Sequence, residues 1–130
     1  MKKDIEIHKV SQIFIAVVPN DAELWDVYLI NQQNYDLQNL LVTTKGYGER
    51  NNQTVSTSTL RHFYEKVPAL SAIKIEPIAT NLFDLAHEYW ISFQHNQFMF
   101  DKKYVFVVGS IHQDYFRTLP ILNVEGIMIG

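Results

Sequence analysis

The sequence predicts an all-β fold, a single antiparallel β-sandwich of about seven or eight strands that spans residues 1–130. The chain has the length of one domain, and its 47% hydrophobic content is sufficient for one buried core. Eight Phe, seven Tyr and two Trp stand against five Gly and four Pro, which favours pleated strands with bulky side chains. The apolar runs are short, turn residues separate them about every ten residues, and no 3.6-residue period persists.

Residues 88–107 form the segment around which the fold is expected to be built. Seven of these twenty residues are aromatic, a composition typical of buried strands rather than of a helix. Between Tyr89 and Phe93, bulky apolar residues at odd positions alternate with a mixed set at even positions. His95-Asn96 lies between two such runs and is expected to form a two-residue turn. The pattern predicts a hairpin that supplies the central strands of a sheet.

The segments before this hairpin also have the apolar pattern of strands. The expected strands are residues 5–7, 12–18, 24–31, 37–45, 57–64 and 70–78. The second is an almost unbroken apolar run, too short for a helix, and the third places Trp25, Val27 and Leu29 on one face. Residues 49–56 are the most polar in the chain, and we expect a mobile loop there.

The strand at residues 70–78 shows a clear alternation. Ile73 and Ile75 are expected on one face, with Lys74 and Glu76 on the other. Pro77 indicates a sheet edge or a strand end, because proline cannot donate to the ladder.

The remaining segments flank the hairpin. Residues 81–87 suit a short helix capped by Asn81, or a loop with apolar anchors. An irregular stretch through Pro120 follows the hairpin, and residues 121–129 are expected to form the last strand.

Three stretches together resemble a family of small uncharacterised bacterial proteins, some of which carry the label phenylalanyl-tRNA synthetase alpha subunit. They are Trp25-Asp26-Val27-Tyr28-Leu29-Ile30-Asn31, Leu41-Val42-Thr43-Thr44-Lys45-Gly46-Tyr47-Gly48 and Pro68-Ala69-Leu70-Ser71-Ala72-Ile73-Lys74-Ile75-Glu76. The resemblance covers most of the chain, and its motifs are structural patterns. Their order is also similar to that of immunoglobulin-type sandwich domains, which implies an immunoglobulin-like fold. The label itself implies an accessory role in phenylalanyl-tRNA aminoacylation.

The residues do not support synthetase chemistry. Gly46-Tyr47-Gly48-Glu49-Arg50 has a local likeness to the third motif of class II synthetases, in which the Arg contacts ATP. Here Asn51-Asn52-Gln53 follows where that motif starts an apolar helix, and catalytic domains of that class are considerably longer. We therefore expect no enzymatic activity of this kind.

Other catalytic or metal-binding patterns are weak. Ser110, His112 and Asp114 are close in sequence, but no Gly-x-Ser-x-Gly motif surrounds the serine, so we expect a turn or a helix cap there. The five histidines are His8, His62, His87, His95 and His112, and no two have the spacing of a local metal-ligand pair. The fold could still bring His62 and His87 together, and the sequence leaves this open. The chain has no cysteine, and we predict no cofactor and no metal.

Charge and hydropathy limit the expected partners and location. The net charge is −3, and no Lys/Arg cluster exceeds a pair, so we expect no nucleic acid as partner. The first residues lack the apolar region of a signal peptide, and no run approaches a membrane span. We expect a cytoplasmic protein that does not associate with a membrane.

Two functional hypotheses follow. The first is a non-catalytic module that binds another protein, or a second copy of itself, through a sheet face or edge. The second is an enzyme or small-molecule binder with a loop site around Tyr47, Arg50 and His112. Trp90 is predicted as core, but an uncovered hairpin face would instead make it part of an exposed partner surface. The candidate binding residues are thus Tyr47, Arg50, Trp90 and His112.

Overall fold

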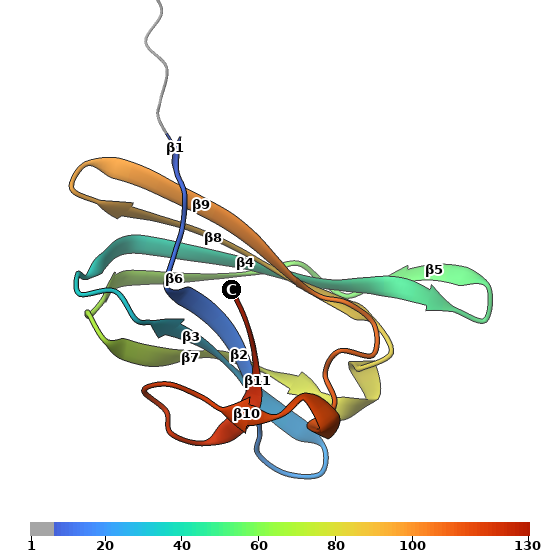
Figure 1. Ribbon diagram of the computed structural model, residues 1–130. Coiled ribbons are helices and arrows are strands. Elements are labelled where there is room, and N and C mark those ends of the chain that lie inside the picture. The colour runs from blue at the N-terminus through green and yellow to red at the C-terminus, as the bar shows by residue number, and fades with distance from the viewer. Residues whose placement is uncertain (1–6) are drawn as a thin grey trace, which may run out of the picture.

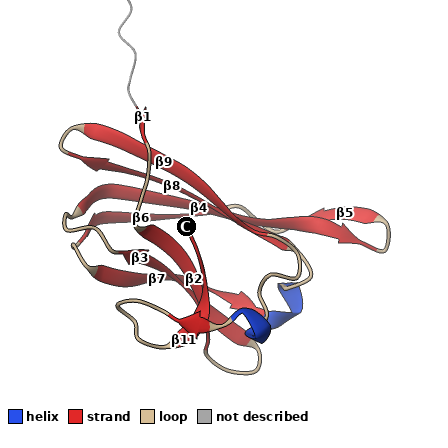
Figure 2. Cartoon of the chain, in the orientation of Figure 1, coloured by secondary structure: helices blue, strands red, loops and turns tan. Residues whose placement is uncertain are grey.

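The computed structural model describes residues 7–130 and shows two β-sheets packed face to face (Figures 1 and 2). The predicted all-β class and the sandwich are therefore confirmed. The two short 3-10 turns, η1 (Thr80–Leu82) and η2 (Gln113–Tyr115), lie together at one end of the sandwich (Figure 2). Among residues 7–130, no helix has the length and apolar character needed to cross a membrane.

Sheet A has the order β1-β9-β8-β4-β5, and β6 also pairs with β4. Its strands are β1 (Ile7–His8), β4 (Leu37–Arg50), β5 (Gln53–Ser56), β6 (Leu60–Val67), β8 (Ala86–His95) and β9 (Phe98–Phe106). Sheet B has the order β10-β11-β2-β3-β7. Its strands are β2 (Ile13–Pro19), β3 (Leu24–Asn31), β7 (Ser71–Ala79), β10 (Arg117–Thr118) and β11 (Glu125–Ile129).

The strands agree with the expected ones in most places, but their number is larger than predicted. The additional strands include β5 and the two-residue strand β10. Ile7 and His8 form β1, which pairs with β9 in parallel, whereas the other pairs are antiparallel; the rest of the edge strand expected at residues 5–7 lies outside the described residues. The strand order is only roughly that of immunoglobulin domains.

The aromatic segment forms the predicted hairpin, with its turn one residue later than expected. His95 pairs with Phe98, so the turn consists of Asn96 and Gln97. Both turn residues have positive φ, 50° and 67°, the geometry of a type I′ turn that matches the twist of the flanking strands. His95 remains in β8, where its ring stacks on Tyr35 with centroids 3.6 Å apart.

The loop expected at residues 49–56 is a second hairpin. β4 continues to Arg50 and pairs with β5 through residue Ser56. The turn residues Asn51 and Asn52 have φ of 52° and 63°, which asparagine tolerates better than most residues. The polar composition of this segment reflects a hairpin that extends beyond the sandwich (Figure 1).

The core lies between the two sheets and contains the predicted apolar faces. From sheet A, Tyr89, Ile91 and Phe93 are at most 1% exposed, and from sheet B, Val27 and Leu29 are fully buried. Burial of such side chains stabilises the fold by about 1.5–3 kcal/mol each. The alternation along β8 and β3 therefore sets which face of each sheet points inward.

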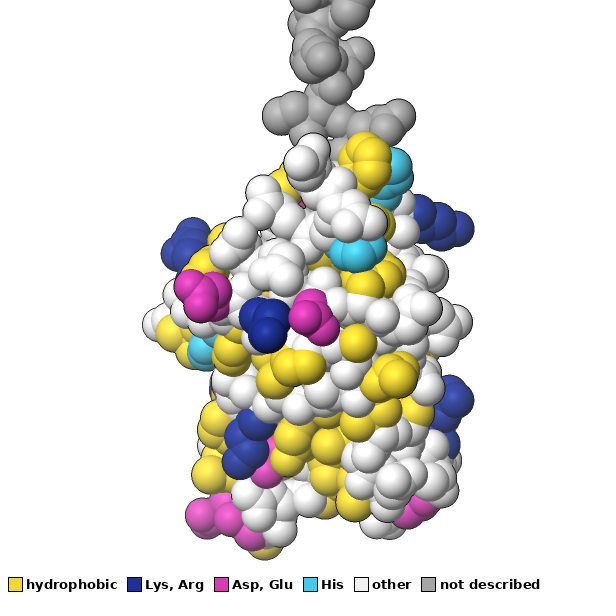
Figure 3. All heavy atoms as spheres, turned by 90° about the vertical axis from the view of Figure 1, so that its left-hand side faces the viewer, with side chains coloured by type: hydrophobic (Ala, Val, Ile, Leu, Met, Phe, Trp, Pro, Cys, Tyr) yellow, Lys and Arg dark blue, Asp and Glu magenta, His cyan; other side chains and the backbone are white. Residues whose placement is uncertain are grey.

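A second apolar cluster covers the outer side of sheet B. Residues 119–124 fold back over the sheet; the sequence predicts that the last strand starts at residue 121, but β11 begins only at Glu125. Leu119 is buried against Ala16 and Ile30, whose side chains point away from the main core. Apolar side chains gather at the surface on this lower side, as seen from the end of the sandwich in Figure 3. The chain thus covers the outer face of sheet B with its own loop.

A β-bulge interrupts the predicted alternation in β7. Lys74 pairs with Tyr28, whereas Glu76 pairs with the adjacent Val27, so Ile75 is an extra residue in the ladder. A bulge of this kind redirects the following side chain. Ile75 is 7% exposed, and Glu76 hydrogen-bonds side chains of sheet A. The expectation that Glu76 shares a face with Lys74 is therefore wrong, because Glu76 points between the sheets.

The η1 turn lacks the N-terminal cap that the sequence suggested at Asn81. It begins at Thr80 after Ala79, and no side chain caps its N-terminus. The helix cap predicted at Asn81 is therefore wrong, since this residue lies within the turn.

Candidate functional site

The first candidate site is the outer face of sheet A, defined as the side chains of β4, β6, β8 and β9 that point away from sheet B. Strand pairing places Phe63 of β6 opposite Leu41 of β4, and Thr43 opposite Trp90 of β8. Leu41 and Trp90 are therefore diagonal neighbours on one face, within reach of large side chains. Phe63, Leu41 and Trp90 form an apolar strip across three adjacent strands.

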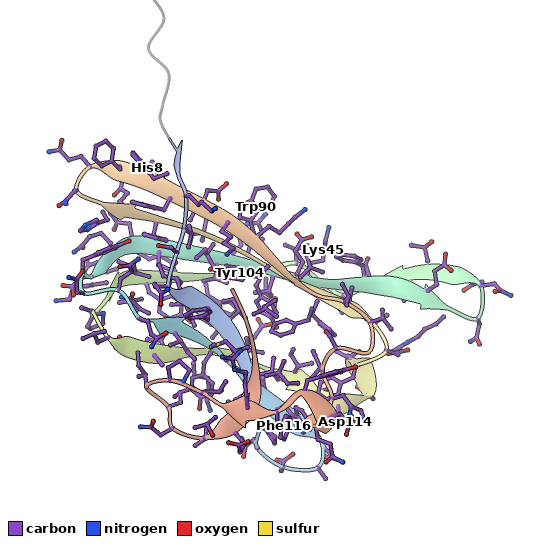
Figure 4. The ribbon with its side chains drawn as sticks, in the orientation of Figure 1. His8, Lys45, Trp90, Tyr104, Asp114 and Phe116 are labelled. Atoms are coloured by element: carbon purple, nitrogen blue, oxygen red, sulfur yellow. The ribbon has the colours of Figure 1, made fainter. Side chains whose placement is uncertain are left out.

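This strip is open to solvent. Phe63 is 62% exposed, Trp90 45% and Leu41 37%. In Figure 4, Trp90 and Lys45 project from sheet A away from sheet B, whereas Tyr104 points towards sheet B. The expectation that Trp90 belongs to the core is wrong, because it occupies an even position in β8 between the buried Tyr89 and Ile91.

Charged groups hold the aromatic rings of this face in place. The indole Nε1 of Trp90 donates to Asp101 Oδ1 at 2.5 Å, and the Lys103 ammonium lies 5.6 Å from the Trp90 ring centroid. Such contacts fix a ring in one orientation at the surface. A fixed ring loses less conformational entropy when a partner binds.

Tyr47 lies on the same face, one strand away. Its hydroxyl donates to Glu88 Oε1 at 3.4 Å, and the Lys45 ammonium lies 5.7 Å from its ring centroid. Burial, followed by the charge of Glu88 and this hydrogen bond, raises the pKa of the Tyr47 phenol. The structure therefore brings two of the predicted binding residues, Tyr47 and Trp90, to one face.

Arg50 has a structural role at the β4–β5 hairpin. Its Nε and Nη2 donate to both carboxylate oxygens of Asp84 at 2.7 and 2.6 Å, and Nη2 also donates to the Asn81 carbonyl. Hydrogen bonding from Arg50 lowers the pKa of Asp84. This bidentate pair joins the hairpin to the segment before β8. Arg50 thus donates hydrogen bonds to residues of its own chain.

His112 lies at the N-terminus of the η2 turn. Its Nδ1 accepts from the backbone N–H of Asp114 at 3.1 Å, which caps η2. The Ser110 hydroxyl donates to the Val107 carbonyl at 2.6 Å. His112 lines a surface hollow with Trp25 and Phe83. The turn predicted at Ser110 is confirmed, and η2 is capped by His112 rather than by Ser110. The loop site around Tyr47, Arg50 and His112 stays a prediction.

The second candidate site is a cavity of about 340 Å³ between the sheets, at the edge formed by β6 and β7. At its wall, Glu76 Oε1 accepts from the Thr44 hydroxyl at 3.0 Å and from His62 Nε2 at 2.7 Å. Glu76 Oε2 accepts from the Tyr89 hydroxyl at 3.2 Å. Burial, then the charge of Glu76 and its hydrogen bond, raise the pKa of Tyr89 well above its usual value. The phenol is therefore a neutral donor.

His87 closes the cavity beside this cluster. It is 5% exposed, and its Nε2 hydrogen-bonds the Leu82 carbonyl at 2.8 Å. A Cβ at Gly46 would lie 3.1 Å from the His87 ring, so the glycine allows the ring to pack against β4. The sequence left open whether the fold gathers His62 and His87; in the structure His62 hydrogen-bonds Glu76, and His87 lines the cavity that Glu76 also lines. Sequence reasoning missed Glu76 itself, because its pattern signalled a solvent-facing position.

Within residues 7–130, no group of three or more His, Asp or Glu side chains is arranged to hold a metal ion. In comparisons with protein-family models, curated proteins and solved structures, the chain has no match.

Proposed function

We propose that this protein is a non-catalytic interaction module that binds another protein through the outer face of sheet A. The observation that carries the proposal is the difference between the two outer faces of the sandwich. The chain covers sheet B with residues 119–124, whereas among the described residues nothing covers the strip of Phe63, Leu41 and Trp90.

The composition of this face supports a protein partner. Protein interfaces combine a buried centre rich in aromatic residues with a polar rim, and Trp, Tyr and Arg are the residues most often found at hot spots. Here Trp90, Phe63 and Tyr47 supply the aromatic groups. Lys45, Glu88, Asp101 and Lys103 supply charges of both signs around them. A mixed rim of this kind favours a partner of complementary pattern over a polyanion.

The remaining parts of the proposal concern location and partner. The net charge of −3 supports a protein rather than a nucleic acid as partner, and we propose that the protein acts in the cytoplasm. The label carried by members of the resembled family names one protein to include in a binding test, phenylalanyl-tRNA synthetase. A second copy of the chain is the other defined candidate.

The test substitutes two exposed residues of the strip and leaves the buried core residues unchanged. In a Phe63→Ser/Trp90→Gln double variant, we expect partner binding to weaken by roughly 30-fold or more, since the loss of a single hot spot already costs about 2 kcal/mol. Binding is measured by quantitative affinity capture from lysate, by titration with purified synthetase, and by sedimentation velocity over a concentration series for self-association. Val108→Ser is the matched control, because Val108 is 59% exposed but lies after β9, outside the strip.

The expected result is a set of bound proteins, or a self-association, that the wild type and Val108→Ser share and the double variant loses. Equal binding by all three proteins would place the interface elsewhere. A monomer that binds no protein would contradict the proposal altogether. Thermal unfolding followed by circular dichroism checks that the double variant is folded.

A further inference from the structure

The cavity between the sheets has the size and the wall of a small-molecule site. Its volume is about 340 Å³, and ligand pockets start at about 300 Å³. Leu60, Ile78 and Leu82 contribute apolar surface, and Leu60, 49% exposed, marks the open side. A ligand with an apolar body fits such a wall.

The hydrogen-bond donors around Glu76 are already used. The Thr44 and Tyr89 hydroxyls both donate to the Glu76 carboxylate. A carboxylate accepts but does not donate, so His62 Nε2 also carries its hydrogen toward Glu76. Because all three hydrogens point to Glu76, the Thr44 and Tyr89 oxygens can only accept further hydrogen bonds. The Glu76 carboxylate can also accept more. The cluster therefore presents negative charge and acceptors to the cavity.

His87 and Thr57 add further acceptors. His87 Nε2 donates to the Leu82 carbonyl, and in this tautomer Nδ1 is an acceptor beside Gly46. The Thr57 hydroxyl donates to the Ser58 carbonyl and already accepts from the Gly46 N–H. Among the described residues that line the cavity, Lys45 is the one Lys or Arg, and its ammonium lies over the Tyr47 ring on the outer face of sheet A.

A group bound here must bring its own donors, and a positive charge would be matched by Glu76. We propose that the cavity binds a small molecule in which an ammonium or amidinium head group is attached to an apolar body. The head group donates to Glu76 and to His87 Nδ1, and the body contacts Ile78 and Leu82. The site does not depend on the outer face of sheet A, which lies on the other side of the same sheet.

The probes for this site are 2-phenylethylamine, hexylamine and benzamidine, with 3-phenylpropionate as the anionic counterpart. They are titrated into the full chain and followed by ¹H–¹⁵N correlation spectra. We expect saturable shifts from at least one amine at Thr44, Gly46, Glu76 and His87, and no shifts there from 3-phenylpropionate. Glu76→Gln should weaken amine binding at least about tenfold, because the charge is lost but the shape is kept.

Two further variants keep the test decisive. Glu65→Gln removes the same charge from an exposed position on β6 outside the cavity and should bind like the wild type. Leu60→Trp narrows the opening without altering the polar cluster and should abolish amine binding. It therefore tests the proposal independently if Glu76→Gln fails to fold. The proposal is overturned if no amine binds saturably, if the carboxylate binds as well as the amines, or if Leu60→Trp binds them unchanged. The Phe63→Ser/Trp90→Gln variant should lose protein binding but still bind amines. The proposed protein interface and the proposed amine site can therefore fail independently.

Discussion

Replacing Phe93 with alanine should lower the free energy of unfolding by about 4 kcal/mol, the largest loss we expect from one substitution. Phe93 is fully buried in the core between the two sheets, and its ring stacks on Phe100 with centroids 4.9 Å apart. Truncating a buried Phe removes its transfer free energy and leaves a cavity that close-packed neighbours fill only in part, at a cost of about 3–5 kcal/mol. Urea denaturation followed by circular dichroism measures the change.

Phe63→Ala is the matched control for this prediction. Phe63 has the same side chain and lies in the same sheet, but it is 62% exposed on the outer face. Its truncation removes little buried area, so we expect a loss within about 0.5 kcal/mol. Similar losses of stability in the two variants would contradict the assignment of Phe93 to the buried face and of Phe63 to the exposed face of sheet A.

Replacing Asn31 with leucine should cost about 3 kcal/mol, the second largest effect. Asn31 is fully buried at the end of β3. Its Nδ2 donates to the carbonyls of Tyr35 and Pro68 at 3.1 and 3.0 Å, and its Oδ1 accepts from the Gln33 N–H at 3.0 Å. Leucine has a similar volume but removes the partner of the Tyr35 carbonyl and of the Gln33 N–H, whereas the Pro68 carbonyl still accepts from the Ser71 hydroxyl at 2.7 Å. Each buried group left without a partner costs about 1–3 kcal/mol. The measurement is again urea denaturation.

Asn34→Leu serves as the control, since Asn34 is exposed in the same connection between β3 and β4. We expect it to change stability by less than about 0.5 kcal/mol. If Asn31→Leu proved equally mild, the side chain of Asn31 would not be the tie between the β3–β4 and β6–β7 connections. That tie is the physical reason why a polar residue follows the apolar run Val27–Ile30 at the end of β3.

The fold was predictable because the side-chain period of a strand shows directly in the sequence. β3 matches its expected bounds, and the buried face of β8 is the one that Tyr89 and Phe93 define. Turns were less certain, because Asn96, Gln97, Asn51 and Asn52 adopt positive φ without a glycine to indicate it. The polarity of residues 49–56 indicates a loop, whereas the structure forms a hairpin there.

The candidate sites were predictable only in part. Alternation along β8 gives Trp90 the opposite face from Tyr89, but whether that face is covered depends on residues 119–124 folding over sheet B and not over sheet A. Glu76 could not be assigned from its pattern, because one extra residue in β7 reverses the face of everything after it. Its partners Thr44 and Tyr89 come from distant strands, and sequence spacing carries no signal for such contacts.

The openness of the outer face of sheet A is the claim on which the proposed function depends, and cysteine labelling tests it most directly. The chain has no cysteine, so a single introduced thiol reports one position. Leu41 and Val42 are adjacent in β4, with 37% and 0% of their surfaces exposed. In dilute native protein, Leu41→Cys should react with a maleimide nearly as fast as in denaturant, and Val42→Cys should react only after unfolding. Equal protection of both thiols would contradict the account, because it would mean that this face is already covered.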